Sequence, residues 1–183
     1  MSYAIFRKLC MKPSYIILTF IFGIIGFGLI YYLQPFKPLD KSVSIDKIVV
    51  TKHKRTLVLI SNNQIIKSYK ISLGRVSKGR KEFEGDNKTP EGFYFINDKN
   101  EKSGYYKNLG ISYPNEMDMK HAKLIGKSPG GMIKIHGIKN GFGWIGRFHL
   151  LLDWTLGCIA MTDKEIDEFY ENVKIGTPIE IKP

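Results

Sequence analysis

The feature that most constrains this chain is an uncharged apolar run from Ser14 to Leu33. A helix needs about 20 such residues to span the hydrocarbon core of a membrane. The run therefore predicts one N-terminal transmembrane helix, and any water-soluble domain must follow it. A cleavable signal peptide is the alternative. We favour an uncleaved anchor because a signal peptide has an apolar segment of about 7–15 residues and a small-residue cleavage site. Here the apolar run is longer, and the bulky Tyr31 and Tyr32 stand at its end in place of small residues.

Basic side chains lie just before the apolar run: Arg7, Lys8 and Lys12. By the positive-inside rule they predict that residues 1–13 stay in the cytoplasm. Residues 14–33 then form a single-pass anchor in the cytoplasmic membrane. Residues 34–42 contain prolines and are typical of a short stiff linker. Residues 43–183 are expected to form one domain on the extracytoplasmic side of the membrane.

The chain carries 28 Lys and Arg against 17 Asp and Glu, which gives a net charge of +11. This excess favours an anionic partner such as nucleic acid, membrane headgroups or a cell-wall polymer. The sequence contains no nucleic-acid-binding motif, so we expect no nucleic acid as a partner. The two cysteines, Cys10 and Cys158, cannot pair with each other if the apolar run spans a membrane. A leftover cysteine in an exported domain suggests a reactive thiol or intermolecular pairing.

Short runs rich in β-branched residues predict most of the domain's structure. The expected strands are Ser44–Thr51, Thr56–Ser61, Gln64–Leu73, Phe93–Asn97, Tyr105–Tyr113, Met132–His136, Cys158–Met161 and Pro178–Lys182. The Asn62-Asn63 step between two of them predicts a hairpin turn. Residues 98–104 read as a polar loop, and the glycine-rich residues 137–149 read as a long loop that forms a substrate wall or lid.

Helix signals are fewer. Thr162 and Glu165 have the spacing of a capping box, and the residues after them put one apolar face on a helix: Ile166, Phe169, Tyr170 and Val173. A shorter helix is expected over 118–126. The sequence therefore predicts a mainly-β domain, a β-sandwich or partly rolled sheet with a C-terminal helix.

Two residues at the edges of predicted strands suggest thiol chemistry. Cys158 follows Gly157 and precedes an apolar run, and His136 ends another apolar run. A histidine close to a cysteine serves as its base, and an imidazolium there lowers the thiol pKa and stores a thiolate. The backbone amides of Leu156, Gly157 and Cys158 are candidates to receive an oxyanion. The carbonyl of Gly137 is a candidate to orient the histidine ring.

Composition alone also permits plainer interpretations. Free cysteine is among the most buried residue types, so Cys158 could be a small core residue and His136 a hydrogen-bonded core histidine. Zinc ligation is disfavoured because the available residues show no short paired spacing: His121, His136, His149 and Cys158. No metal site is therefore predicted.

The motifs and their order resemble the YkuD-type L,D-transpeptidase catalytic domain, in particular its YafK-like branch. The motifs are Thr89-Pro90-Glu91-Gly92, Ile135-His136-Gly137 and Thr155-Leu156-Gly157-Cys158. The branch resemblance lies in Ile111-Ser112-Tyr113-Pro114-Asn115, Ser128-Pro129-Gly130-Gly131 and Gly157-Cys158-Ile159-Ala160-Met161-Thr162. The likeness extends from Ser44 to Pro183.

This resemblance implies a peptidoglycan L,D-transpeptidase that acts on stem peptides without a cofactor. Cys158 would attack the diaminopimelate carbonyl, form a thioester and release the terminal D-alanine, with His136 as the catalytic histidine. The acyl group would pass to the amine of another stem, to a wall-attached lipoprotein or to water. Gly157 and Thr155 match the family's oxyanion and Ser/Thr positions.

The chain also departs from the wider family pattern. Ala160 stands where many relatives have an arginine, so Arg147 is the candidate for a contact with a substrate carboxylate. Leu156 replaces a histidine that often precedes the Gly-Cys pair. Trp144, in the expected lid, and Tyr113 complete the expected substrate-binding residues.

Two rival functions follow from the same residues. In the first, the same nucleophile hydrolyses stem peptides as an L,D-endopeptidase or carboxypeptidase, or releases wall-attached protein. In the second, the domain binds or organises the cell wall without catalysis, and Cys158 can be replaced without consequence. Products formed from muropeptides separate the first rival from a transpeptidase.

Overall fold

The computed structural model describes residues 13–40 and 43–183, and it divides the chain into two units, residues 1–36 and 37–183. In the first unit, α1 (Pro13–Tyr32) is a helix of 20 residues. Its length and apolar composition are sufficient to cross a membrane, and a signal sequence meets the same criterion. The predicted cytoplasmic residues 1–12 and residues 41–42 of the predicted linker lie outside the described residues.

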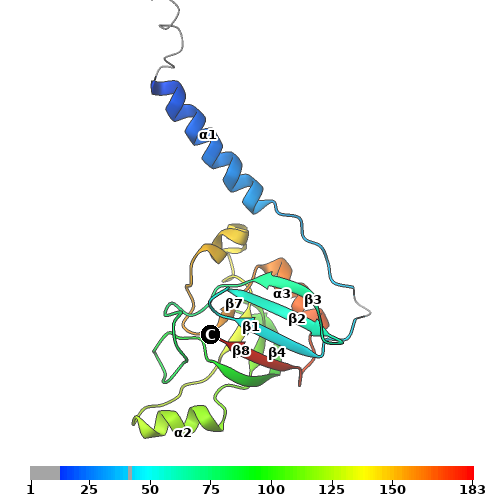
Figure 1. Cartoon of the computed structure of the whole chain (residues 1–183), viewed down its shortest axis with the longest axis vertical. Coiled ribbons are helices and arrows are strands. Elements are labelled where there is room, and N and C mark those ends of the chain that lie inside the picture. The colour runs from blue at the N-terminus through cyan, green and yellow to red at the C-terminus, as the bar shows by residue number, and fades with distance from the viewer. Residues whose placement is uncertain (1–12, 41–42) are drawn as a thin grey trace, which may run out of the picture. The chain divides into compact units, whose positions relative to one another are not determined.

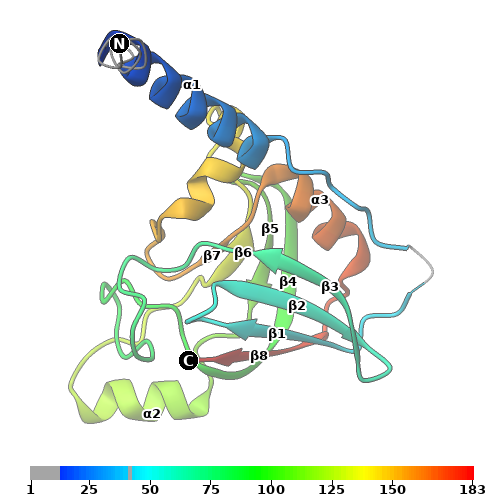
Figure 2. The ribbon, with the colours of Figure 1, turned by 45° about the horizontal axis from the view of Figure 1, so that its top comes forward.

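The second unit is built on a β-sheet with helices around it (Figure 1). Its strands are β1 (Lys47–Thr51), β2 (Thr56–Ser61), β3 (Gln64–Lys70), β4 (Gly92–Ser103), β5 (Tyr106–Ile111), β6 (Lys134–His136), β7 (Ile159–Ala160) and β8 (Pro178–Lys182). Within the described residues they form one eight-stranded sheet in the order β3-β2-β1-β8-β4-β5-β6-β7. Figure 2 shows β8 between β1 and β4. The predicted mainly-β domain is therefore confirmed.

The β2–β3 hairpin follows directly from local chemistry. Asn62 and Asn63 both have positive φ, 47° and 60°, as a two-residue turn of the mirror-image type requires. Side chains of β2 alternate between half-buried and buried, so one face of the strand packs on the core. The predicted boundaries of β2 and of this turn are confirmed.

The sheet is rolled so that its two ends meet. Beyond β3, Ser72 pairs with Ala160 of β7 through two backbone hydrogen bonds of 2.9 and 2.8 Å. Two residues further on, Gly74 is bridged to Thr155. These contacts bring the chain that follows the first hairpin against the segment that precedes β7.

Helix α3 (Asp163–Asn172) closes one side of this roll. Thr162 and Glu165 form the predicted capping box in both directions. Ile166 and Phe169 are fully buried and belong to the same core cluster as the strands. The second helix, α2 (Glu116–Leu124), begins with its own capping box at Asn115 and lies apart from α3 (Figure 2).

Two expected loops are partly regular structure. Residues 98–103, expected to be loop, belong to β4, which pairs with β8 over residues 92–95 and with β5 from Ile96 onward. The side chains in the outer half of β4 are mostly polar, and they are exposed or half-buried. Pairing with β5, rather than apolar content, therefore keeps this half extended. The expected loop 137–149 contains most of a 3₁₀ segment, η2 (Gly143–Leu151), with non-helical backbone at Gly146.

Candidate active site

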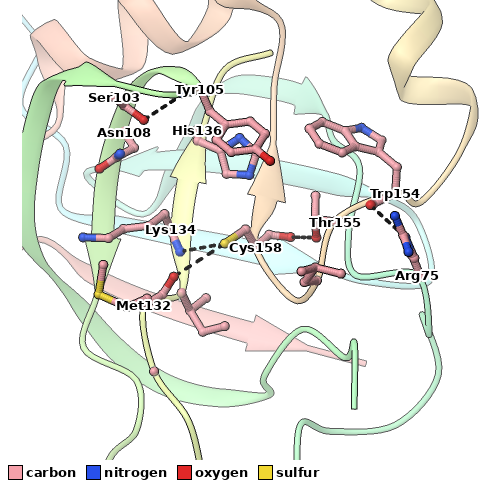
Figure 3. A pocket seen from close by; sticks show the side chains of 13 residues that line it. Arg75, Ser103, Tyr105, Asn108, Met132, Lys134, His136, Trp154, Thr155 and Cys158 are labelled. Atoms are coloured by element: carbon pink, nitrogen blue, oxygen red, sulfur yellow. Dashed lines mark hydrogen bonds between the residues drawn. The ribbon is translucent and has the colours of Figure 1, made fainter. Parts of the chain in front are cut away.

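The pairing of β6 with β7 brings the predicted nucleophile and base to one face. These strands run parallel, with Ile135 opposite Ile159 and His136 opposite Ala160. Alternate residues of a strand share a face, so Lys134 and His136 point the same way, and so do Cys158 and Ala160. The three polar side chains line one cleft of about 460 Å³ (Figure 3).

His136 is held in a single tautomer. Its Nδ1 lies 2.7 Å from the carbonyl oxygen of Gly137. A carbonyl oxygen only accepts hydrogen bonds, so Nδ1 carries the proton and Nε2 keeps its lone pair. The residue is only 5% exposed, and burial lowers the pKa of its ring, although the Gly137 carbonyl acts in the opposite direction. Neutral His136 is therefore built as a proton acceptor.

Cys158 is a free, half-buried thiol. Its Sγ lies 3.4 Å from the backbone N–H of Lys134, which donates to it, and 3.6 Å from the carbonyl oxygen of Met132. Burial raises the pKa of the thiol, and the Lys134 amide and ammonium only partly offset this effect. Together with the lowered pKa of His136, this favours a neutral thiol beside a neutral imidazole. The stored thiolate expected from the sequence is therefore the less favoured form at rest.

The turn before Cys158 is fixed by Thr155. The Thr155 hydroxyl donates to the carbonyl oxygen of Cys158 at 2.7 Å and accepts from the amide of Gly157 at 3.1 Å. The Gly157 amide therefore already donates a hydrogen bond to Thr155. This differs from the expectation that it would donate to an oxyanion. Among the hydrogen bonds of the described residues, none is donated by the amides of Leu156 or Cys158. These two amides remain as candidates for that role.

Gly157 has a conformation and a position that only glycine fits. Its φ is +132°, and an added Cβ would lie 2.8 Å from the carbonyl oxygen of Lys88. A Cβ on neighbouring Gly74 would lie 2.2 Å from the carbonyl oxygen of Asn87 and 3.1 Å from the Cα of Gly157. The backbone segments under the nucleophile are thus in direct contact.

The Thr89-Pro90-Glu91-Gly92 motif supports this arrangement from below. Buried Thr89 accepts a hydrogen bond from the amide of Gly74 at 2.9 Å through its hydroxyl. Its carbonyl accepts from the ammonium of Lys52 at 3.0 Å. That buried ammonium also donates to Gly79 O at 2.6 Å and to the Glu91 carboxylate at 2.7 Å. The motif therefore acts in the scaffold and does not touch the thiol.

Aromatic side chains hold the imidazole from two sides. The ring centroid of His136 is 4.7 Å from that of Tyr105 and 5.7 Å from that of Trp154, which meets it edge-on. The indole N–H of Trp154 donates to Nδ1 of His149 at 3.2 Å. Burial, helped by repulsion from His136 and Arg147, lowers the pKa of His149 to about 4. Neutral His149 can therefore accept this bond at physiological pH.

Two cations line the cleft, Lys134 and Arg75, and neither is among the site residues expected from the sequence. The Lys134 ammonium pairs with the carboxylate of Asp98. Arg75 donates from Nε to the carbonyl oxygen of Trp154 at 3.2 Å. Asn108, opposite His136 on β5, also lines the cleft. Only Lys134 could have been linked to the site from the sequence, because it stands two residues before His136 on the same strand. Arg75 and Asn108 come from distant segments that only the fold brings together.

The structure brings Thr155, Leu156, Cys158 and His136 together at the cleft, with Gly137 and Gly157 directly adjoining them. It does not bring the three other expected substrate-binding residues there. Tyr113 is a core residue, and its hydroxyl donates to Pro129 O at 2.9 Å. Arg147 pairs with Glu165 of α3 at 3.5 Å, and Trp144 lies exposed on η2. Among the described residues, no group of three or more His, Cys, Asp or Glu side chains could hold a metal.

Comparisons with known proteins identify relatives of this chain. The chain is 33% identical over 132 residues to YafK of Escherichia coli strain K12, which covers 69% of this chain and 46% of that protein. The solved structure of Pgp2, a helical cell shape determining protein from Campylobacter jejuni, is 28% identical with a TM-score of 0.56. The match covers 79% of this chain and 52% of the Pgp2 chain.

A third protein, Bd1075 of Bdellovibrio bacteriovorus, is 25% identical with a TM-score of 0.53, over 78% of this chain and 49% of its own. The chain thus spans about half the length of each of these relatives. The family model of the YkuD L,D-transpeptidase catalytic domain matches residues 45–181, which is nearly all of the second unit. The chain therefore belongs to the YkuD L,D-transpeptidase family.

Proposed function

We propose that this chain is a peptidoglycan L,D-transpeptidase in which Cys158 is the nucleophile and His136 the general base. One observation carries the proposal. The Gly137 carbonyl holds the proton on Nδ1 of His136, so the lone pair of Nε2 is left for the thiol in the same cleft. Membership of the family supplies the substrate class, the stem peptides of peptidoglycan.

The first half-reaction starts from the neutral pair. As the sulfur of Cys158 attacks the diaminopimelate carbonyl, its proton moves to Nε2 of His136 and the new S–C bond forms. The carbonyl oxygen becomes an oxyanion beside the free amides of Leu156 and Cys158. The C–N bond then breaks, and the imidazolium returns the proton to the departing amine of D-alanine. The product is a neutral imidazole and a thioester.

The second half-reaction reverses these roles. The amine of an acceptor stem attacks the thioester and gives a proton to Nε2 of His136. The S–C bond breaks, and the leaving sulfur recovers that proton as a thiol. The result is a new amide cross-link and the starting enzyme. Water in place of the amine gives a carboxylic acid, which is the product of a hydrolase.

We further propose that α1 anchors the chain in the inner membrane and that the domain works in the periplasm. The support is the length and apolar character of α1 and the basic residues that precede it in the sequence. The net charge of +11 suits an anionic polymer. Separation of membrane and soluble fractions, with the N-terminal sequence of the mature chain, tests this location.

The activity is tested with the full chain in detergent and purified muropeptides. We expect D-alanine release and a transient mass increase on Cys158, followed by dimeric muropeptides. Cys158→Ala should abolish both the adduct and the products while leaving the melting temperature within a few degrees. His136→Gln should slow adduct formation by about 10²- to 10⁴-fold, because it removes the general base.

Each alternative outcome is distinct. Shortened monomers without dimers would replace the transpeptidase by a hydrolase that uses the same residues. Products that persist in Cys158→Ala would contradict the assigned nucleophile. A wild-type chain that binds peptidoglycan without forming an adduct or a product would leave a non-catalytic wall-binding domain.

A further inference from the structure

The cleft presents one cation on each side of the thiol (Figure 3). Lys134 is already paired with the carboxylate of Asp98, and its side chain is 16% exposed. Arg75 is exposed, and its one side-chain hydrogen bond within the described residues leaves from Nε. The terminal nitrogens of its guanidinium are therefore available, and a guanidinium binds carboxylates through two parallel hydrogen bonds.

Arg75 is fixed to the same loop as the nucleophile. Its backbone N–H donates to Thr155 O at 3.0 Å, and its Nε donates to Trp154 O at 3.2 Å. The preceding residue, Gly74, is packed against Gly157. Both ends of the arginine are thus tied to the segment that carries Cys158, so its position relative to the sulfur is set by the fold.

The chemistry of acyl transfer places the leaving residue on this side of the cleft. The departing amine must take its proton from His136, so its nitrogen lies beside that ring. The ring is contacted by Trp154, and the carbonyl of Trp154 holds Arg75. In a terminal amino acid the carboxylate is only two bonds from the nitrogen. A carboxylate on the leaving residue can then reach toward the Trp154 side of the cleft, where Arg75 lies, whereas Lys134 lies on the opposite side of the thiol (Figure 3).

We propose that Arg75 binds the free terminal carboxylate of the leaving residue and so restricts the enzyme to stems that end one residue after the scissile bond. This inference rests on the function proposed above, and it adds a specificity-determining residue. A stem in which that carboxylate is replaced by an amide, or extended by another residue, cannot form the paired hydrogen bonds with the guanidinium.

The test measures kcat/KM of the full chain on two stem tetrapeptides that differ only in a free or an amidated C-terminus. The wild type should prefer the free carboxylate by about 10- to 100-fold, the range expected for hydrogen bonds to a charged group. Arg75→Met should lose that factor on the free acid and change little on the amide. Arg75→Lys should recover part of it. The matched variant Lys134→Met, on the opposite side of the cleft, should keep the preference.

A second measurement does not depend on turnover. In a Cys158→Ala background, the dissociation constant of the free tetrapeptide should rise when Arg75→Met is added, whereas that of the amide should not. Equal losses on both peptides would show a structural role and overturn the inference. So would a wild type that does not distinguish them, or a preference that is lost in Lys134→Met instead. Failure of the wild type to process either peptide would contradict the proposed function itself.

Discussion

The residues beneath the nucleophile and those around the mouth of the cleft differ in how tightly they are held. We call the first group the floor: Gly74, Thr89, Thr155 and Gly157. We call the second group the rim: Arg75, Met132, Lys134 and Leu156. In the floor, hydroxyls are bonded to backbone and the glycines leave no space for a Cβ. In the rim, Met132 and Leu156 are 78% and 67% exposed.

This difference separates two tasks. The floor fixes the backbone from which the sulfur projects, because a displacement of about 1 Å at a reacting atom costs about 100-fold in rate. The exposed side chains of the rim, those of Met132 and Leu156, meet what enters from solvent. Substitutions in the floor should therefore damage stability and rate together, whereas substitutions at these exposed rim positions should mainly alter substrate choice.

The largest expected effect concerns the protonation of the thiol itself, which lies between floor and rim. Burial raises the pKa of Cys158 and lowers that of His136, so both groups are neutral near pH 7. Alkylation of Cys158 by iodoacetamide should rise about tenfold per pH unit between pH 6 and 9, as the thiolate fraction grows. Turnover should instead rise through the lowered pKa of His136, below pH 6.5, and then stay level.

Mass spectrometry of a Cys10→Ser chain measures this alkylation at one site, because it removes the second thiol of the sequence. An alkylation rate that is already high at pH 5 and flat up to pH 8 would show a stored thiolate. The neutral pair would then be wrong, and the imidazolium first expected from the sequence would be right.

In the floor, Gly157→Ala should have the largest effect of a single methyl group. An alanine Cβ would be strained at the positive φ and would lie too close to the Lys88 carbonyl oxygen. The free energy of unfolding should therefore fall by about 1–3 kcal/mol. Turnover should fall about 100-fold because the sulfur moves. Thermal denaturation and D-alanine release measure the two losses. Gly104→Ala is the matched control, since a Cβ there meets nothing within 4 Å.

Thr155→Val should have a smaller effect in the same region. It keeps the shape of the side chain but removes the hydroxyl that bonds to both Cys158 O and Gly157 N. We expect a loss of about 1–3 kcal/mol in the free energy of unfolding and a lower kcat, measured by urea denaturation and steady-state kinetics. Thr155→Ser should restore most of both. If the valine variant kept wild-type kcat, the hydroxyl would not position the nucleophile.

The smallest effect is expected in the rim, for Leu156→Ala. The side chain is 67% exposed, so the free energy of unfolding should change by less than about 0.5 kcal/mol. The KM for a stem peptide should rise by less than about fivefold, because part of one apolar contact is lost. A melting temperature that fell as far as in Gly157→Ala would remove the distinction between floor and rim.

The elements that could be predicted from sequence are those whose cause is local. The ends of β2 and β8 and the capping box of α3 follow from alternation and from side chains three residues apart. Residues 98–103 could not be assigned, because their strand is set by pairing with β5 and not by composition.

At the site, the motifs identified the nucleophile position and the base position but not their surroundings. Tyr105 and Trp154 contact His136 from separate parts of the chain, so no spacing in the sequence connects them. Tyr113 stands in a recognisable motif and is expected to contact substrate, yet its side chain is buried in the core. Lys134 could have been found, since it stands two residues before His136 on the same strand.

The position of β8 has a consequence for how the protein folds as it is made. This strand comes last in the sheet's chain order, yet it pairs with both β1 and β4. Residues 178–182 must therefore leave the ribosome before β1 and β4 can be joined through β8. Until then the first hairpin can meet the cleft only through the contacts of Ser72 and Gly74 with Ala160 and Thr155. On the way to the location proposed above, a chain that crosses the membrane unfolded would complete the cleft around Cys158 only after it arrives.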